Sequence, residues 1–334
     1  MDNSFQASGT DHGRETSMIQ SAERIFVMGH ESPIGSALVR QLIRVGHPHN
    51  QILVRSPSEP MWTDQESVCE YLAAQQLDMV YLIDSACSEA DDRTHPAHAK
   101  SGKRFLPPSA MIKAAFNAGV GRLMHVATAA TEPAALQRDD VLNASDLDYR
   151  RVLTCEPYGP YWPGRAPLKM PPAARLIERL LHQFSTALVC GADPVTIKAN
   201  PGDRLELMFV NDIAEAIVQV MDAPRCVLNA HAPTPTVHIE IGADNDVEVV
   251  DLVRAVAAAA GFRGGWKFEA THPSQAGRRL DNSVLAGLGW RPLIQLDTGL
   301  ELTAMDFRLR HMTRHMSTKD AHRHSASSAA SASN

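Results

Sequence analysis

The sequence GHESPIG, residues 29–35, has glycines at the two positions where a tight strand-to-helix turn needs them. Before it, residues 25–28 (IFVM) form the short apolar run of a strand that is buried on both faces. After it, apolar residues recur as on one face of an amphipathic helix, at Ile34, Leu38, Leu42 and Val45. Because the first amides of a helix bind anions, this pattern predicts a site for a dinucleotide pyrophosphate. The residues expected to line it are Gly29, His30, Ser32, Ile34 and Gly35.

Several residues near the same turn oppose the binding of an anion. Ser32 and Pro33 stand where backbone should approach phosphate, and Pro33 has no amide hydrogen to donate. Glu31 adds a carboxylate beside the expected position of the pyrophosphate, and like charges repel there. Asp84, directly after the apolar run of residues 78–83, either caps a local turn or adds a second carboxylate near the ligand. We therefore expect Glu31, Ser32 and Asp84 to weaken cofactor binding.

The alternation of apolar runs and amphipathic segments indicates a doubly wound α/β fold with a parallel sheet. Strands are expected at residues 25–28, 51–55, 78–83, 122–127, 149–154 and 238–242. Helices are expected to follow the glycine turn, to open at Asp64, and to cover residues 107–119, 168–188, 213–221 and 247–260. Asp212 is expected to cap the helix over residues 213–221.

The turn and its helix, GHESPIGSALVRQL, resemble the GHRGxxGSA and xRQL elements of the GDP-L-fucose synthase family, which belongs to the extended short-chain dehydrogenase/reductases. DYRRVLTCEPYGP (148–160) is similar to DYRSVxPTNLYGP of that family, and LGWRP (288–292) ends a further similar segment. The resemblance implies a Rossmann-like sheet with a smaller C-terminal α/β substrate-binding lobe. It also implies NADP-dependent epimerisation and reduction of a GDP-4-keto-6-deoxy sugar.

The resemblance assigns expected roles to single residues. Thr128 keeps a hydroxyl where the family uses a serine to orient the substrate carbonyl. Arg55, at the end of the second expected strand, matches an arginine that meets the 2′-phosphate of NADP; a plain surface arginine is the alternative. Asp64 opens a helix that lies near the adenine in the family. On the substrate side, the cations that could bind a phosphate are Arg204, Arg278 and Arg279, and a solvated surface role is the alternative for the last two.

The sequence differs from the family at the positions that carry its chemistry. No tyrosine is followed four residues later by a lysine, the pair that transfers a proton during hydride transfer. Ala130 and Tyr161 replace the cysteine and histidine of epimerisation, and Leu205 replaces a substrate-binding arginine. Two alternatives stay open: an epimerase/reductase with impaired or differently supported catalysis, and a catalytically inactive homologue that acts as a binding or assembly protein.

The interval between the matched segments, residues 134–148, is too short for the family's tyrosine helix. Since that helix forms half of the usual dimer interface, a homodimer of this chain would lack part of that surface. Tyr161 with Arg165 is the nearest substitute for the missing pair, but Pro163 and Gly164 break any helix between them.

The expected organisation is a dinucleotide-binding domain over residues 24–164 and a mainly substrate-binding lobe over residues 165–310. Segments 206–222 and 236–242 could return to the first domain. Residues 1–23 are expected to form a flexible leader, and residues 311–334, rich in His, Ser and Ala, a disordered tail without a metal site.

Composition fits a globular enzyme, and a cytoplasmic location is expected because no apolar run resembles a secretion signal or a membrane span. The net charge of -6 over 334 residues gives no reason to expect nucleic acid or an anionic membrane as a partner. Five cysteines are scattered without metal-ligand spacing, so buried, reduced thiols are expected. A GDP-sugar is the expected small-molecule ligand.

Overall fold

The structure is a computed structural model that describes residues 23–55, 64–83, 106, 108–129, 147–161, 171–231, 238–271 and 279–311. Asp84, Ala130, Arg165 and Arg278 lie outside the described residues, as do most of the expected leader and tail.

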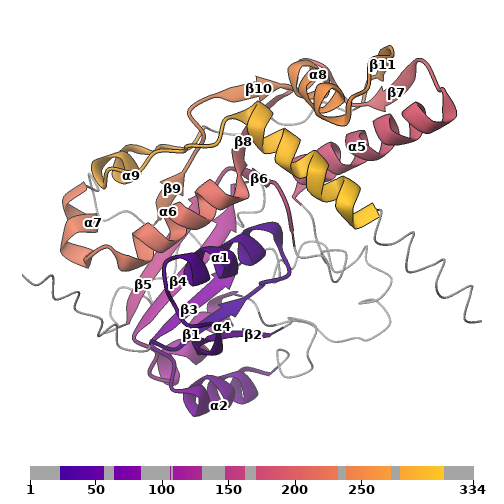
Figure 1. Cartoon of the computed structure of the whole chain (residues 1–334). Helices are drawn as coiled ribbons and strands as arrows, with labels where there is room; N and C mark the ends of the chain where they lie inside the picture. The colour runs from indigo at the N-terminus through magenta and orange to yellow at the C-terminus, as the bar shows by residue number, and fades with distance from the viewer. Residues whose placement is uncertain are drawn as a thin grey trace, which may run out of the picture.

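The centre of the molecule is a six-stranded parallel sheet, which confirms the predicted fold class (Figure 1). Its strand order is β2-β1-β3-β4-β5-β9. The bounds are Ile25–Met28 (β1), Ile52–Arg55 (β2), Met79–Ile83 (β3), Arg122–Thr128 (β4), Asp148–Thr154 (β5) and Ile239–Ile241 (β9). Every residue of β1 and β3 is buried, because helices cover both faces of a parallel sheet and each strand must be apolar throughout.

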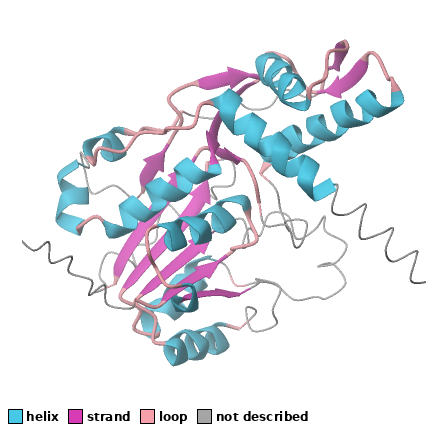
Figure 2. Ribbon diagram, viewed as in Figure 1, coloured by secondary structure: helices cyan, strands magenta, loops and turns pink. Residues whose placement is uncertain are grey.

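Two pairs of helices cover the two faces of this sheet (Figure 2). On one face, α1 (Pro33–Arg44) packs against α6 (Val210–Asp222), and both contribute to one apolar core with alternate strand residues. On the other face, α2 (Gln65–Gln75) packs against α4 (Pro108–Asn117) over a second core. A short 3-10 turn, His49–Gln51, leads into β2. The carboxyl ends of the strands therefore meet at one edge, where α1 also begins.

A smaller α/β region lies beyond that edge. One sheet has the order β10-β8-β6, with β6 (Glu156–Tyr158), β8 (Arg204–Phe209) and β10 (Asp246–Glu248). A second pairs β7 (Val195–Lys198) with β11 (Trp266–Glu269). The helices are α5 (Pro172–Cys190), α7 (Arg225–His231), α8 (Val249–Ala260), α9 (Ser283–Gly287) and a C-terminal helix over residues 296–311. The division into domains by function stays a prediction.

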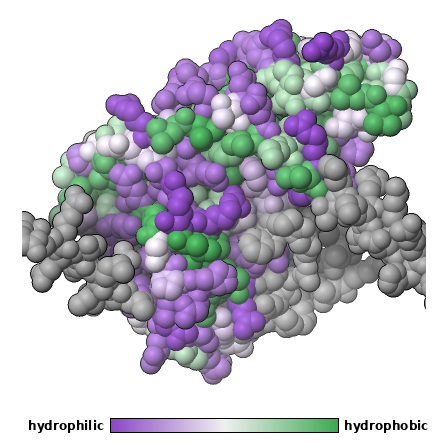
Figure 3. Space-filling view, viewed as in Figure 1, coloured by the Kyte–Doolittle hydropathy of each residue, from purple (hydrophilic) through white to green (hydrophobic). Residues whose placement is uncertain are grey.

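Figure 3 shows hydrophilic residues over much of one face of the molecule, with apolar residues in smaller groups. One such group lies over the end of α5. Leu188 and Val189, near the C-terminus of that helix, are exposed. No helix within the described ranges has the length and apolar character that a membrane span requires.

The predicted start of α6 was wrong. The helix begins at Val210 with Phe209 as its N-cap, so Asp212 lies in the first turn and does not cap it. The Asp212 side chain is instead buried, and its Oδ2 accepts hydrogen bonds from the backbone amides of Leu293 and Ile294 at 3.1 and 2.8 Å. This carboxylate therefore fixes the segment that leads into the C-terminal helix.

Two further details of the helix predictions were wrong. Val45 was expected on the buried face of α1, but the helix ends at Arg44 and Val45, its C-cap, is 42% exposed. Val247 was expected to begin a helix, yet it pairs with Leu205 across β10 and β8, and α8 starts at Val249.

Candidate functional site

The turn between β1 and α1 has the close backbone contact that its glycines predict. Gly29 has φ +85°, a value that side-chain-bearing residues rarely adopt. A Cβ on Gly35 would lie 2.1 Å from the carbonyl oxygen of Gly29, which no packed structure tolerates. Both glycines are therefore required by the fold of this turn, whichever ligand it binds.

Ser32 uses the start of α1 for an internal cap. Its Oγ accepts a hydrogen bond from the amide of Gly35 at 3.0 Å and donates one to the carbonyl of Gly29 at 2.8 Å. The amide of Ser36 is taken by the Ser32 carbonyl at 2.9 Å, and Pro33 has no amide hydrogen. Among the described first-turn amides, Ile34 is the one that no hydrogen bond of the turn uses. Groups of the turn thus accept the hydrogen bonds of amides that an anion would otherwise bind.

The other predicted residues of the turn flank this cap. Ile34, in the first turn of α1, is buried in the core, while His30 and Glu31 are partly exposed between Gly29 and Ser32. A carboxylate therefore does sit in the turn. Its effect on cofactor binding stays a prediction.

Arg55 ends β2 next to this turn. It is the register partner of Met28, the residue that precedes Gly29. Its Nε donates a hydrogen bond to the hydroxyl of Tyr71 at 3.3 Å, and its guanidinium carbon lies 5.7 Å from the centre of the Tyr71 ring. The predicted position of Arg55 beside the turn is thus observed, and its role towards a 2′-phosphate stays a prediction.

Asp64 begins α2 as expected. It is the N-cap, and its Oδ2 accepts hydrogen bonds from the amide and the hydroxyl of Ser67, both at 2.8 Å. The Ser67 amide is also the main reason why the pKa of the Asp64 carboxyl is lowered. This carboxylate serves the helix, and its expected place near an adenine stays a prediction.

Thr128 and Thr154 lie side by side at the carboxyl ends of β4 and β5. They are register partners, so both side chains point to the same face, and the amide of Ala129 donates to the Thr154 carbonyl at 2.8 Å. Thr128 is 7% exposed. The Oγ1 of Thr154 is buried and, within the described residues, has no hydrogen-bond partner. Sequence reasoning found Thr128 but not its neighbour, since register pairing is not visible in the order of residues.

All five tyrosines of the chain are among the described residues, and each is held by other groups. Tyr81 is buried within β3, and Tyr149 on β5 contacts Nδ1 of His125 at 3.4 Å. Tyr158 stacks edge-on against Phe209 and donates to the Leu296 carbonyl at 3.4 Å. Burial raises the pKa of Tyr81 and of Tyr158 far above the ordinary value for a phenol.

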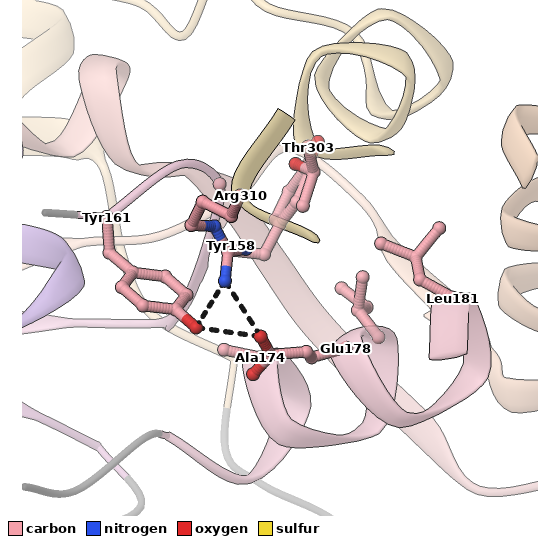
Figure 4. Close-up of a pocket in the computed structure, with 9 residues that line it drawn as sticks. Tyr158, Tyr161, Ala174, Glu178, Leu181, Thr303 and Arg310 are labelled. Carbon is pink, nitrogen blue, oxygen red and sulfur yellow. Dashed lines mark hydrogen bonds and ion pairs between the residues drawn. The ribbon is translucent and has the colours of Figure 1, made fainter. Parts of the chain in front are cut away.

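Tyr161 has a cation beside its phenol, which the sequence did not suggest. Nη1 of Arg310, on the C-terminal helix, donates to the Tyr161 hydroxyl at 2.6 Å, and Tyr161 donates to Oε1 of Glu178 at 2.7 Å (Figure 4). Arg310 also pairs with Glu178 at 3.0 Å and with Asp306 at 2.7 Å. The guanidinium carbon lies 4.2 Å from the centre of the Tyr161 ring. We call Tyr161, Glu178, Arg310 and Asp306 the Arg310 cluster.

The Arg310 cluster stabilises the protonated phenol. Burial is the main cause that raises the pKa of Tyr161 well above its ordinary value, and the hydrogen bond to Glu178 raises it further. Arg310 acts in the opposite direction but does not outweigh them. The cavity next to these residues has a volume of about 10 Å³, room for roughly one water molecule. This cluster therefore joins three segments of the chain and has no space for a sugar in this conformation.

The described arginines predicted for substrate binding are engaged by neighbouring groups. Arg204 pairs with Asp246 at 2.6 Å and with Glu248 at 2.7 Å on the adjacent strand β10. It points away from Leu205, because successive strand residues face opposite sides. Arg279 donates to the backbone carbonyl of Asp244. The structure thus places Arg204 in the small sheet and not with the glycine turn, and a substrate role for either arginine stays a prediction.

No group of three or more His, Cys, Asp or Glu side chains among the described residues has an arrangement that could hold a metal ion. Four of the five cysteines are described, and all four are free thiols. Cys155 is buried as predicted, but the prediction was wrong for Cys190 and Cys226, which are exposed. Burial raises the pKa of the Cys155 thiol well above its usual range, so this residue is not a reactive thiolate.

Comparison with known proteins points to one group of enzymes. Residues 25–160 match the model of the NAD dependent epimerase/dehydratase family. The chain is 25% identical over 315 residues to GDP-L-fucose synthase of Escherichia coli (strain K12), which covers 85% of this chain and 96% of that protein. It is 25% identical over 317 residues to GDP-L-fucose synthase 1 of Arabidopsis thaliana, covering 86% and 94%.

Solved structures show the same fold. GDP-mannoheptose C4 reductase from Campylobacter jejuni, solved with NADP bound, superposes with a TM-score of 0.62 at 18% identity and covers 86% of this chain and 98% of its own. A GDP-L-fucose synthetase from Naegleria fowleri gives 0.64 at 10% identity, covering 87% and 94%. Residues 25–160 are thus similar to the NAD dependent epimerase/dehydratase family, and most of the chain is similar to GDP-L-fucose synthases.

Proposed function

We propose that this chain binds a nicotinamide dinucleotide, NADP rather than NAD, together with a GDP-sugar at the carboxyl edge of the six-stranded sheet. We further propose that it does so as a catalytically inactive homologue of nucleotide-sugar epimerase/reductases. The observation that carries the proposal is the position of the five tyrosines. Each is buried or bonded to other groups, and no described lysine hydrogen-bonds to any of them.

Binding of the dinucleotide is supported by the turn and by the relatives. Gly29 and Gly35 keep the close contact that brings β1 and α1 together, and Arg55 lies beside Met28 at the same edge. The Campylobacter jejuni reductase of the same fold was solved with NADP bound. The Ser32 cap and Glu31 support a weaker affinity than an uncapped turn would give.

Loss of hydride transfer is supported by the chemistry of the phenols. Reduction of a carbonyl needs a proton donor beside the hydride acceptor, and a nearby cation must lower the pKa of a phenol for it to serve near neutral pH. In this chain burial raises the pKa of Tyr81, Tyr158 and Tyr161. Among the described residues, no lysine lies beside these three tyrosines to lower the pKa of their phenols.

A second candidate is an active reductase of the GDP-L-fucose synthase type. Two observations favour it: the Thr128 hydroxyl at the end of β4, and the contact between the Tyr161 phenol and the Arg310 cation. In that case Thr128 would orient the sugar carbonyl, and Tyr161 would donate the proton after the small cavity opens. Full-length similarity to GDP-L-fucose synthases supports the same substrate class.

Calorimetry with NADPH and with NADH tests the first proposal. We expect NADPH to bind and GDP-4-keto-6-deoxymannose with NADPH to give no product above a protein-free control. Failure of both dinucleotides to bind would overturn the proposal. Product formation that disappears in Tyr161→Phe and persists in Tyr149→Phe would establish the second candidate instead.

A further inference from the structure

We infer that Tyr71 is a positioning residue that sets the preference of this chain for NADP over NAD, and that it acts through Arg55. The inference rests on the proposed binding of a nicotinamide dinucleotide. Tyr71 lies on α2. This helix follows β2 in the chain, and residues 56–63 between them lie outside the described ranges.

Arg55 is in the right place to meet the ribose end of a dinucleotide but is exposed at the end of its strand. A long exposed arginine samples many rotamers, and fixing it for one contact costs conformational entropy. A cation that selects between two ligands by one phosphate must therefore be held before the ligand arrives.

Tyr71 can restrain the Arg55 side chain because the Tyr71 ring itself packs against the core. Its ring packs edge-on against Phe26, with centroids 6.0 Å apart and planes at 63°. Phe26 is fully buried in β1, within the core between the sheet, α2 and α4. The tyrosine is thus anchored to the central strand from which the glycine turn begins.

The contact between the two residues leaves the arginine with a defined orientation. The phenol oxygen accepts from Nε at 3.3 Å, and the guanidinium carbon lies 5.7 Å from the ring centre. Because Tyr71 uses Nε, its hydroxyl would not compete with a phosphate for the edge formed by the two Nη nitrogens. That edge can bind two oxygens of one phosphate in parallel, which is the geometry that makes arginine selective for phosphate groups.

Arg55 and Tyr71 therefore have different roles, which the sequence does not reveal. Arg55 contacts the additional phosphate of NADP, while Tyr71 touches no part of the ligand and determines how Arg55 is oriented. NADH, which lacks the 2′-phosphate, gains nothing from this arrangement.

The test compares dissociation constants of NADPH and NADH for the full-length chain and its variants. Tyr71→Phe keeps the ring against Phe26 and removes the acceptor oxygen. We expect the NADH/NADPH ratio of dissociation constants to fall about threefold to tenfold, with the NADH value unchanged. Arg55→Met should bring the ratio close to one, and Tyr71→Phe in the Arg55→Met background should have no further effect.

Tyr149→Phe is the matched control, since its phenol contacts His125 and not Arg55, and it should leave the ratio unchanged. An unchanged ratio in Tyr71→Phe, or an equal loss of NADPH affinity with and without Arg55, would overturn this inference alone. Failure of the unchanged chain to bind either dinucleotide would overturn the proposed function and this inference with it.

Discussion

The hydroxyl oxygen of Ser32 lies 3.0 Å from the backbone nitrogen of Gly35, so a side chain of the turn occupies an amide at the start of α1. The same hydroxyl donates to the Gly29 carbonyl, which ties the two ends of the turn together. In a phosphate-binding turn these amides are kept for the ligand. Here an entering phosphate must displace the Ser32 hydroxyl or use the amide of Ile34 alone.

Replacing Ser32 by glycine should strengthen the binding of NADPH. The Gly35 amide then becomes available to the phosphate, and one such hydrogen bond to a charged group contributes about 1.5 kcal/mol net, roughly tenfold in affinity. Stability should fall by only a few tenths of a kcal/mol, because glycine is tolerated at an N-cap. Calorimetry compares the dissociation constant of NADPH for Ser32→Gly with that for the unchanged chain, and Ser36→Ala serves as the control. An unchanged dissociation constant in a folded Ser32→Gly variant would contradict this role of the cap.

Replacing Gly35 by alanine should destabilise the fold. The new Cβ would lie 2.1 Å from the Gly29 oxygen and must push the turn away from α1, at a cost of about 1–3 kcal/mol. Gly202→Ala is the matched control, since a Cβ there meets no atom within 4 Å, and it should change stability by less than about 0.5 kcal/mol. Urea unfolding measures the difference. Equal stability of the two variants would show that the turn is not tightly packed.

The buried carboxyl of Asp212 should make stability depend on pH. Burial raises its pKa in the folded state, although the amides of Ile294 and Leu293 act in the opposite direction. The folded state therefore holds this proton more tightly than the unfolded state does, whose pKa is about 3.9. The stabilising contribution is full below that pH and is lost as the pH rises through the folded pKa.

Asp212→Asn removes the ionisable group but keeps a side-chain oxygen that can accept from both amides, because a single oxygen of Asp212 accepts both hydrogen bonds. We expect this variant to show a smaller fall in the free energy of unfolding above about pH 4 than the unchanged chain. Asp212→Ala should lose about 2–4 kcal/mol, because two amides lose their acceptor. Urea unfolding across this pH range measures both effects. A pH profile of Asp212→Asn that coincides with that of the unchanged chain would refute the assignment.

The Arg310 cluster should contribute to stability through charge pairing. Arg310→Ala leaves Glu178 and Asp306 without their cation, and since both retain some exposure we expect a loss of about 1–3 kcal/mol. Tyr161→Phe removes hydrogen bonds to the ion pair and should cost about 1 kcal/mol. Arg308→Ala on the exposed side of the same helix should cost less than about 0.5 kcal/mol. Denaturant unfolding that gives similar losses for Arg308 and Arg310 would contradict the cluster's role.

The sequence predicted the parts of the fold that depend on neighbouring residues. The run of residues 25–28, the two glycines and the apolar spacing of α1 indicate a strand, a turn and a helix within a short stretch of chain. The same local reasoning located Arg55 at the end of β2, and it predicted β4 up to Ala127, one residue short of its observed end at Thr128. These predictions succeeded because backbone sterics and burial act over a few residues.

Contacts between distant segments could not be predicted from the order of residues. Asp212 precedes an apolar helical run, as a helix cap does, but its partners are 81 and 82 residues further along the chain. Arg310, the cation beside the Tyr161 phenol, comes from a helix 149 residues later. No local spacing indicates such a pair, since only tertiary packing brings the two groups together.

A single-turnover experiment with the protein in excess over NADPH, in the presence of GDP-4-keto-6-deoxymannose, tests the proposed loss of catalysis. Mass spectrometry of the sugar nucleotide then measures how much reduced product forms. We expect NADPH to bind and no product to form above the protein-free control. Oxidised cofactor and reduced sugar nucleotide in equal amounts, above that control, would refute the proposal.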